Sequence, residues 1–178
     1  DCLVIELALQ KLAAEGHEGY IFLNLSPRAM VLNEFARSLR QIVADSGIPP
    51  ERIVFEITER DTVKNLALME RFLNDLKFDG FKLAIDDFGS GFSSFHYLRR
   101  FPVDFLKVEG DFVVNILHST KDRAFVQSMQ SLAHELGIQV IAEFVETGEV
   151  LDELKRMGMD MAQGYYIGRP DREIRKPA

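Results

Sequence analysis

The sequence predicts an α/β protein of the (β/α)8 TIM-barrel type, here incomplete, with about six parallel strands alternating with helices. Short apolar runs alternate regularly with segments of helical period, which is typical of a parallel sheet covered by helices. Each apolar run also ends in polar residues. A barrel gathers such strand ends around one opening, whereas an open sheet spreads them along a line. Complete barrels usually have eight strands in about 250 residues, so about two strands are expected to be missing from the start of these 178 residues.

In the first part of the chain, the spacing of apolar residues predicts two helices and two strands. Residues 3–14 have apolar side chains at helical spacing. Asn33 can cap a second helix, which ends at Gly47. The apolar runs at 20–23 and 53–55 are too short and too continuous for surface helices, so they predict strands.

The rest of the chain repeats this alternation without a repeat or linker that would divide it. The expected strands are 82–85, 105–108, 139–142 and 160–163, and the expected helices are 66–76, 95–100, 122–136 and 149–157. Asp122 is expected to cap its helix and to place Phe125, Met129, Leu132 and Leu136 in the core. We therefore expect one barrel domain at 1–170, lacking its first strands, and a C-terminal tail at 171–178.

The charge and the amino-acid composition of the chain indicate which kinds of ligand and environment suit it. A net charge of −7 and a pI of about 5.1 disfavour binding to bulk nucleic acid. They leave room for a small phosphate ligand, because bound divalent cations reverse the local field of an acidic pocket. The single cysteine, Cys2, is compatible with a reducing cytoplasm, where we expect the protein. The chain contains no run of 18 apolar residues, so the sequence predicts no membrane segment in it.

Candidate functional residues lie at the ends of all the predicted strands. They are Asn24, Glu56, Asp86 with Asp87, Lys107 with Glu109, Glu143 and Gln163, in strand order. One acidic residue at a strand end is most often a cap or turn residue, but a complete set predicts a shared site. Carboxylate and amide oxygens suit Mg²⁺ or Mn²⁺, and two such ions can clamp a phosphoryl group and activate water. Lys107 could then hold that water or stabilise the departing oxygen.

Six motifs, in this order along the chain, resemble the signature motifs of EAL domains. They are residues 24–26, 56–59, 86–94, 106–108, 142–147 and 163–165. The resemblance implies a metal-dependent barrel that hydrolyses cyclic di-GMP to the linear dinucleotide with two Mg²⁺ or Mn²⁺ ions. It also implies a possible homodimer and a possible cyclase-like or sensor domain in the parent protein.

The resemblance further implies roles for individual residues. Asn24, Glu56 and Asp86 would bind one metal ion, and Asp86, Asp87 and Glu143 the second. Lys107 would contact the catalytic water, and Gln163, Glu109 and Asp87 would bind substrate or water. Glu59 resembles the residue that anchors the loop at 87–94, which in the family links metal binding to dimer contacts.

Departures from the family pattern leave alternatives open. The Glu-Ala-Leu triplet is not in the chain, so these residues alone are expected to have little or no activity. Glu109 stands where aspartate is usual, and Phe144 stands where glycine is most common. The first alternative is a degenerate EAL domain that acts as a non-catalytic cyclic di-GMP receptor. The second is an enolase-like lyase with Mg²⁺ and a lysine base.

Overall fold

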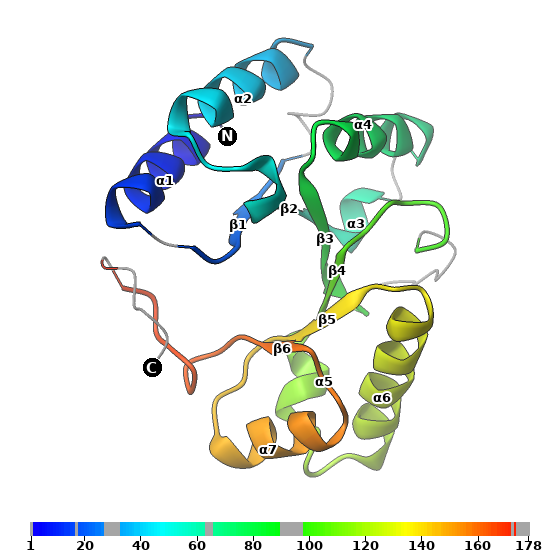
Figure 1. Cartoon of the computed structure of the whole chain (residues 1–178). Coiled ribbons are helices and arrows are strands. Elements are labelled where there is room, and N and C mark those ends of the chain that lie inside the picture. Colours follow the sequence, from blue (N-terminus) through cyan, green and yellow to red (C-terminus); the bar gives the residue numbers. More distant parts are fainter. Residues whose placement is uncertain are drawn as a thin grey trace.

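The computed structural model describes residues 2–16, 18–26, 33–62, 66–89, 98–171 and 173. Its six parallel strands form one sheet in chain order, which confirms the predicted class (Figure 1). They are β1 (Ile21–Asn24), β2 (Ile53–Thr58), β3 (Lys82–Phe88), β4 (Phe105–Val108), β5 (Gln139–Ala142) and β6 (Met161–Ala162). The sheet curls into a half-barrel whose two edges in the described residues are β1 and β6.

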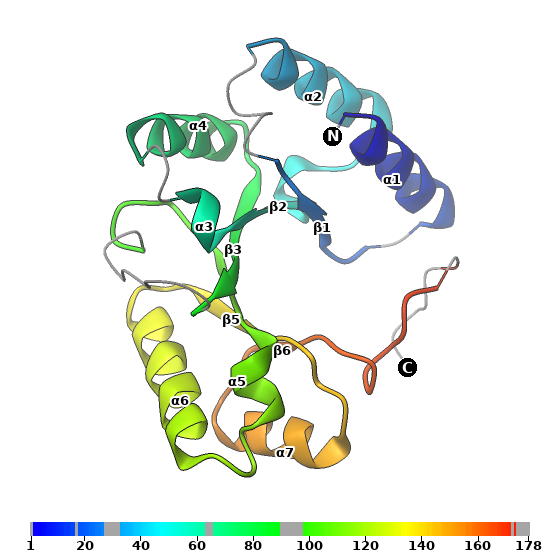
Figure 2. The same ribbon diagram turned by 180° about the vertical axis from the view of Figure 1, so that it is seen from behind.

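Helices lie on the outside of the curled sheet, and within the described residues they connect all successive strands except β3 and β4. They are α1 (Cys2–Glu15), α2 (Asn33–Ser46), α3 (Glu59–Thr62), α4 (Leu66–Phe78), α5 (Gly110–Val114), α6 (Thr120–Glu135) and α7 (Gly148–Arg156), with a 3-10 turn, η2, at Pro50–Arg52. Seen from behind, α1, α2 and α4 lie beside β1 to β3, and α5, α6 and α7 lie beside β5 and β6 (Figure 2). No helix in these described ranges is long and apolar enough to cross a bilayer.

The predicted strands are confirmed, and β2 and β3 extend further than expected. They continue past Glu56 and Asp87, because the partner strands supply hydrogen bonds that the local pattern does not reveal. The short helices α3 and α5 were not predicted, since neither is long enough to show a helical period. Of the helix expected at 95–100, residues 95–97 lie outside the described residues, and residues 98–100 form a turn instead of a helix.

The prediction that Asp122 caps α6 is wrong. The Ser119 hydroxyl accepts the Asp122 backbone N–H at 3.2 Å, so Ser119 is the N-cap. The helix therefore begins earlier than expected, and its buried side is formed by Val126, Met129, Gln130 and Ala133. Leu136, expected in the core, is the C-cap residue and is 41% exposed.

Two apolar layers hold the half-barrel together. The larger layer lies between the sheet and the helices, and it includes Leu9, Phe55, Leu83 and Met129. The smaller layer fills the inner face of the sheet with one residue from each strand: Phe22, Val54, Ala84, Phe105, Ile141 and Met161. The alternation of strand side chains between two faces explains why both layers can be apolar.

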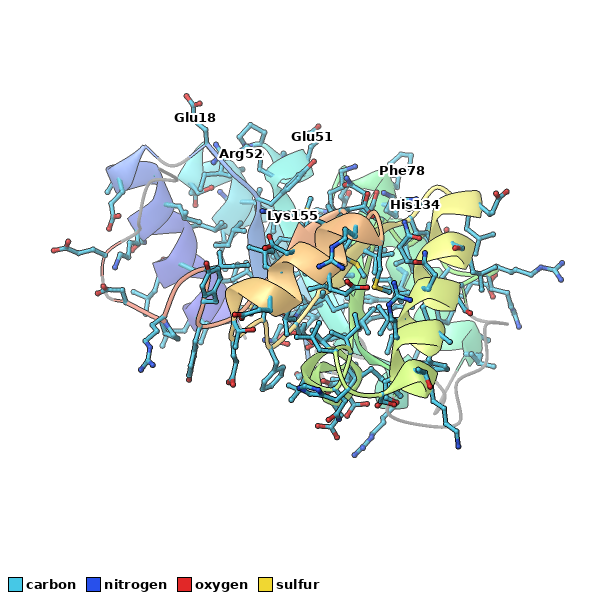
Figure 3. The ribbon with its side chains drawn as sticks, turned by 90° about the horizontal axis from the view of Figure 1, so that it is seen from below. Glu18, Glu51, Arg52, Phe78, His134 and Lys155 are labelled. Carbon is cyan, nitrogen blue, oxygen red and sulfur yellow. The ribbon has the colours of Figure 1, made fainter. Side chains whose placement is uncertain are left out.

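Residues that precede four of the strands lie on one side of the molecule (Figure 3). Glu18, Arg52, Phe78 and His134 precede β1, β2, β3 and β5, and all four lie along that side. Because the strands are parallel, their carboxyl ends lie together at the opposite side, where barrel enzymes have their active sites.

Candidate active site

The inner apolar layer determines which polar side chains enter the barrel opening. Side chains two residues apart on a strand point to the same face. The residues two positions beyond the layer are therefore stacked on it at the carboxyl ends. In strand order they are Asn24, Glu56, Asp86, Lys107, Glu143 and Gln163. All six were predicted from the sequence as site residues, and the period of the strands explains why they share one face.

Lys107 lies among three of the carboxylates. Its Nζ is 2.9 Å from Glu56 Oε1, 2.9 Å from Asp86 Oδ1 and 3.0 Å from Glu143 Oε1. Lys107 is only 4% exposed, and Glu56 and Glu143 are 5% and 8% exposed. The buried ammonium group on β4 therefore contacts carboxylates from β2, from β3 and from the residue after β5.

The charges in this cluster change one another's pKa values. Burial alone would lower the pKa of Lys107, but the hydrogen bonds and charges of Asp86, Glu56 and Glu143 outweigh it and raise the pKa well above its usual range. Burial raises the pKa of Glu143 to about 6, with Lys107 opposing the change and the other carboxylates adding to it. Burial likewise raises the pKa of Glu56. The cluster has more negative charge than one lysine can neutralise.

Asp87 joins the cluster although its position in the strand alternation points it to the other face. Its φ is 53°, and the pairing of β3 with β4 shifts register between Ile85 and Phe88. One ligand oxygen each from Asp86, Asp87 and Glu143 then lies within 4.8 Å of the others. These hard oxygen donors fit a divalent cation such as Mg²⁺ or Mn²⁺.

Other predicted residues lie around this centre. Asn24 pairs in register with Glu56 on the neighbouring strand, and its side chain is exposed. Glu59 accepts the backbone N–H of Gly89 through Oε2 at 3.1 Å, at the start of the loop that it was expected to anchor. Residues 90–94 of that loop lie outside the described residues.

Glu109 lies on the Asp87 side of the opening. Its backbone N–H donates to the Phe88 carbonyl at 3.2 Å. Burial, followed by the charges of Asp111 and Asp87, raises the pKa of its carboxyl group. The ion pairs that the described residues make with Lys107 do not include Glu109.

A cavity of about 390 Å³ opens beside the cluster, and its lining includes residues without a predicted role. It is lined by Glu143, Phe144, Glu146, Gln163, Gly164 and Tyr165. Glu146 and Tyr165 belong to the motifs at 142–147 and 163–165, and sharing a motif with Glu143 or Gln163 was the signal that could have found them. Gly164 is required here, since a Cβ would come within 2.7 Å of the Val145 carbonyl carbon. The cavity combines acidic, amide and aromatic groups.

Comparison with known proteins is consistent with this arrangement. Residues 1–170 match the EAL domain family. The chain belongs to this family. It is 40% identical over 169 residues to the cyclic di-GMP phosphodiesterase PdeB of Shewanella oneidensis, covering 95% of this chain and 18% of PdeB. It is 34% identical over 174 residues to the cyclic di-GMP phosphodiesterase PdeA of Borreliella burgdorferi, covering 96% of this chain and 26% of PdeA. This EAL chain thus spans about a fifth to a quarter of these relatives.

Two solved structures have the same fold. The manganese and cyclic di-GMP complex of Klebsiella pneumoniae BlrP1 has a TM-score of 0.90 and 30% identity, covering 95% of this chain and 44% of BlrP1. The Pseudomonas aeruginosa FimX EAL domain bound to cyclic di-GMP has a TM-score of 0.89 and 28% identity, covering 97% of this chain and 70% of that domain. The EAL resemblance and the barrel-type fold predicted from the sequence are both confirmed.

Proposed function

We propose that this EAL chain is the catalytic part of a metal-dependent phosphodiesterase that hydrolyses cyclic di-GMP to its linear dinucleotide. The observation that carries the proposal is the buried Lys107 among three carboxylates, with Asp87 beside them. Burying several like charges at one point is costly unless cations compensate them. A stable core would not need such a cluster, whereas a metal site does.

The donor set suggests how two ions would be held. Asn24, Glu56 and Asp86 would hold one ion, and Asp86, Asp87 and Glu143 the other. The register of β1 with β2 and the oxygen distances within the acidic cluster support this division. When bound, Mg²⁺ or Mn²⁺ would offset phosphate charge and supply an activated water.

The residues of the chain would do the remaining work. The Lys107 ammonium would orient the carboxylates and donate a hydrogen bond to water or to the departing oxygen, whose charge it would stabilise. The Gln163 side chain lines the cavity next to Glu143 and can hydrogen bond to water or substrate. Phe144 and Tyr165 give the same cavity an apolar surface on which a nucleotide can rest. Glu59 holds Gly89 and so steadies the chain that follows Asp87.

The remaining expectations also belong to this proposal. They are the Mg²⁺ or Mn²⁺ requirement, the homodimer, a neighbouring cyclase-like or sensor domain, and a cytoplasmic location. They concern a whole protein, whereas this chain spans 18% of PdeB and 26% of Borreliella burgdorferi PdeA. The low activity expected of these 178 residues alone is a prediction of the same kind.

A cleavage assay tests the proposed function. The natural full-length protein would be incubated with cyclic di-GMP and Mn²⁺ or Mg²⁺ beside two variants, Glu143→Ala and the exposed control Glu135→Ala. We expect linear product from the parent and the control, and a loss of at least about 10²-fold in Glu143→Ala. Cyclic di-GMP binding without cleavage would make the protein a receptor. If the protein neither binds nor cleaves cyclic di-GMP, the proposal is refuted.

A further inference from the structure

Phe144 has a backbone conformation that phenylalanine rarely adopts. Its φ of 55° lies in the left-handed region, where a Cβ is crowded and where glycine is the usual residue. Such conformations persist only where surrounding contacts hold them, and they cluster at functional sites. Within the described ranges, the other non-glycine residue with a positive φ is Asp87, which belongs to the acidic cluster.

The ring of Phe144 lies against Gly110, the first residue of α5. Gly110 is buried, and a Cβ added to it would come within 2.6 Å of Phe144 Cγ and 2.9 Å of Cε2. No real Cβ contact is that short, so the ring can occupy its place only because position 110 has no side chain. Phe144 is still 59% exposed, so the contact with Gly110 covers part of a ring that otherwise faces the cavity.

The main chain on both sides of this contact is fixed. Next to Gly110, the Glu109 N–H donates to the carbonyl of Phe88 at 3.2 Å, at the end of β3. Next to Phe144, the Val145 N–H donates to the Gln163 carbonyl at 3.0 Å, just after β6. The ring therefore contacts one anchored segment from the other. Glu143 directly precedes Phe144, so its side chain lies next to this contact in the chain.

We infer that Phe144 is a positioning residue for Glu143, and that Gly110 is the position that accepts its ring. Ring contact with Gly110 holds residue 144 in the left-handed conformation, and this conformation keeps the Glu143 carboxylate beside Asp86 and Lys107. A glycine at position 144 would adopt this conformation without strain, whereas phenylalanine needs the contact to hold it there. The inference deepens the proposed function and rests on it, because it assigns Phe144 a role in the metal site of that enzyme.

Mn²⁺ affinity of the natural full-length protein tests this inference without any substrate. Bound Mn²⁺ loses the sharp magnetic resonance signal of the free ion, so the signal reports affinity directly. Phe144→Gly should bind within about threefold of the parent, because glycine adopts the left-handed conformation freely. Phe144→Ala should bind at least about tenfold more weakly, because it keeps the Cβ and loses the ring contact.

Gly110→Ala supplies the matched test from the other side of the contact. Position 110 is helical, so alanine suits its backbone, and the ring alone opposes the added methyl group. We expect Mn²⁺ affinity to fall at least about tenfold in Gly110→Ala and to return to within about threefold of the parent in Gly110→Ala/Phe144→Gly. Circular dichroism would establish that each variant is folded.

Several outcomes would overturn the inference. They are equal Mn²⁺ affinities in Phe144→Ala and Phe144→Gly, a defect in Gly110→Ala that the double variant keeps, or no Mn²⁺ binding by the parent. If Gly110→Ala does not fold, the comparison of the two Phe144 variants decides alone. If the expected Mn²⁺ pattern appears but the parent does not cleave cyclic di-GMP, the proposed activity fails and the positioning role stands.

Discussion

Replacing Lys107 by methionine removes the cation from the buried cluster while keeping a side chain of similar length. Each contact of about 3 Å has a Coulomb attraction of about 5–6 kcal/mol at an effective dielectric constant of 20, and desolvation offsets most of it. Breaking a buried pair and leaving its partner charged costs about 3–5 kcal/mol in unfolding free energy. We expect a loss of that size for Lys107→Met in metal-free protein at pH 7.5, measured by urea unfolding in the presence of a chelator.

Lys82→Met is the matched control, because Lys82 pairs with Asp104 at 3.2 Å and is about one-third exposed. An exposed pair is worth about 0–1 kcal/mol, so the control should change the unfolding free energy by no more than that. The Lys107→Met loss should also shrink at pH 5, since Glu143, with a pKa of about 6, then takes up a proton. Equal urea midpoints for the two variants at pH 7.5 would refute the idea that Lys107 stabilises this cluster.

Three further predictions concern the groups around that cluster. Burial raises the pKa of Glu143 from its ordinary value of 4.5 to about 6 in the folded protein. Protonation of Glu143 therefore stabilises the metal-free protein. This contribution is complete below pH 4.5 and is lost as pH rises through 6. It amounts to at most about 2 kcal/mol, and Glu143→Gln should flatten this part of the urea stability profile; an unchanged profile would contradict the assignment. Gly164→Ala should lower the unfolding free energy by about 1–3 kcal/mol through overpacking, whereas Gly168→Ala, which has open space around it, should change it by less than about 0.5 kcal/mol. Glu59→Ala leaves the Gly89 amide without its acceptor, which costs about 1–3 kcal/mol, so hydrogen exchange at this amide should speed up in proportion. Glu59→Gln should retain most of the protection, and identical exchange in all three proteins would exclude this anchor.

Much of the fold could be predicted because its signals are local. The strands at 105–108 and 139–142 are found where the apolar runs predicted them, since a buried parallel strand needs a continuous apolar run. The start of α6 could not be predicted as well. Ser119 and Asp122 are both good caps three residues apart, and packing against the sheet decides which one begins the helix.

The meeting of the candidate residues at one opening could be predicted to a similar degree. The residues Glu56, Asp86, Lys107 and Glu143 were expected at one opening, and the structure brings them into contact. The sequence could not indicate that Lys107 would pair with all three carboxylates. That arrangement depends on the register of neighbouring strands, which the chain sets through contacts between residues that are distant in sequence.

The sequence by itself determined the order of strands and helices, the face on which each strand residue lies, and membership of the EAL family, because period and motif are written within a few neighbouring residues. Only the tertiary structure decided how Asp87 joins the cluster and how the ring of Phe144 lies against Gly110. Left-handed backbone is unfavourable locally for both Asp87 and Phe144, so no local pattern predicts it. It exists where strand pairing and side-chain packing from several parts of the chain enforce it together.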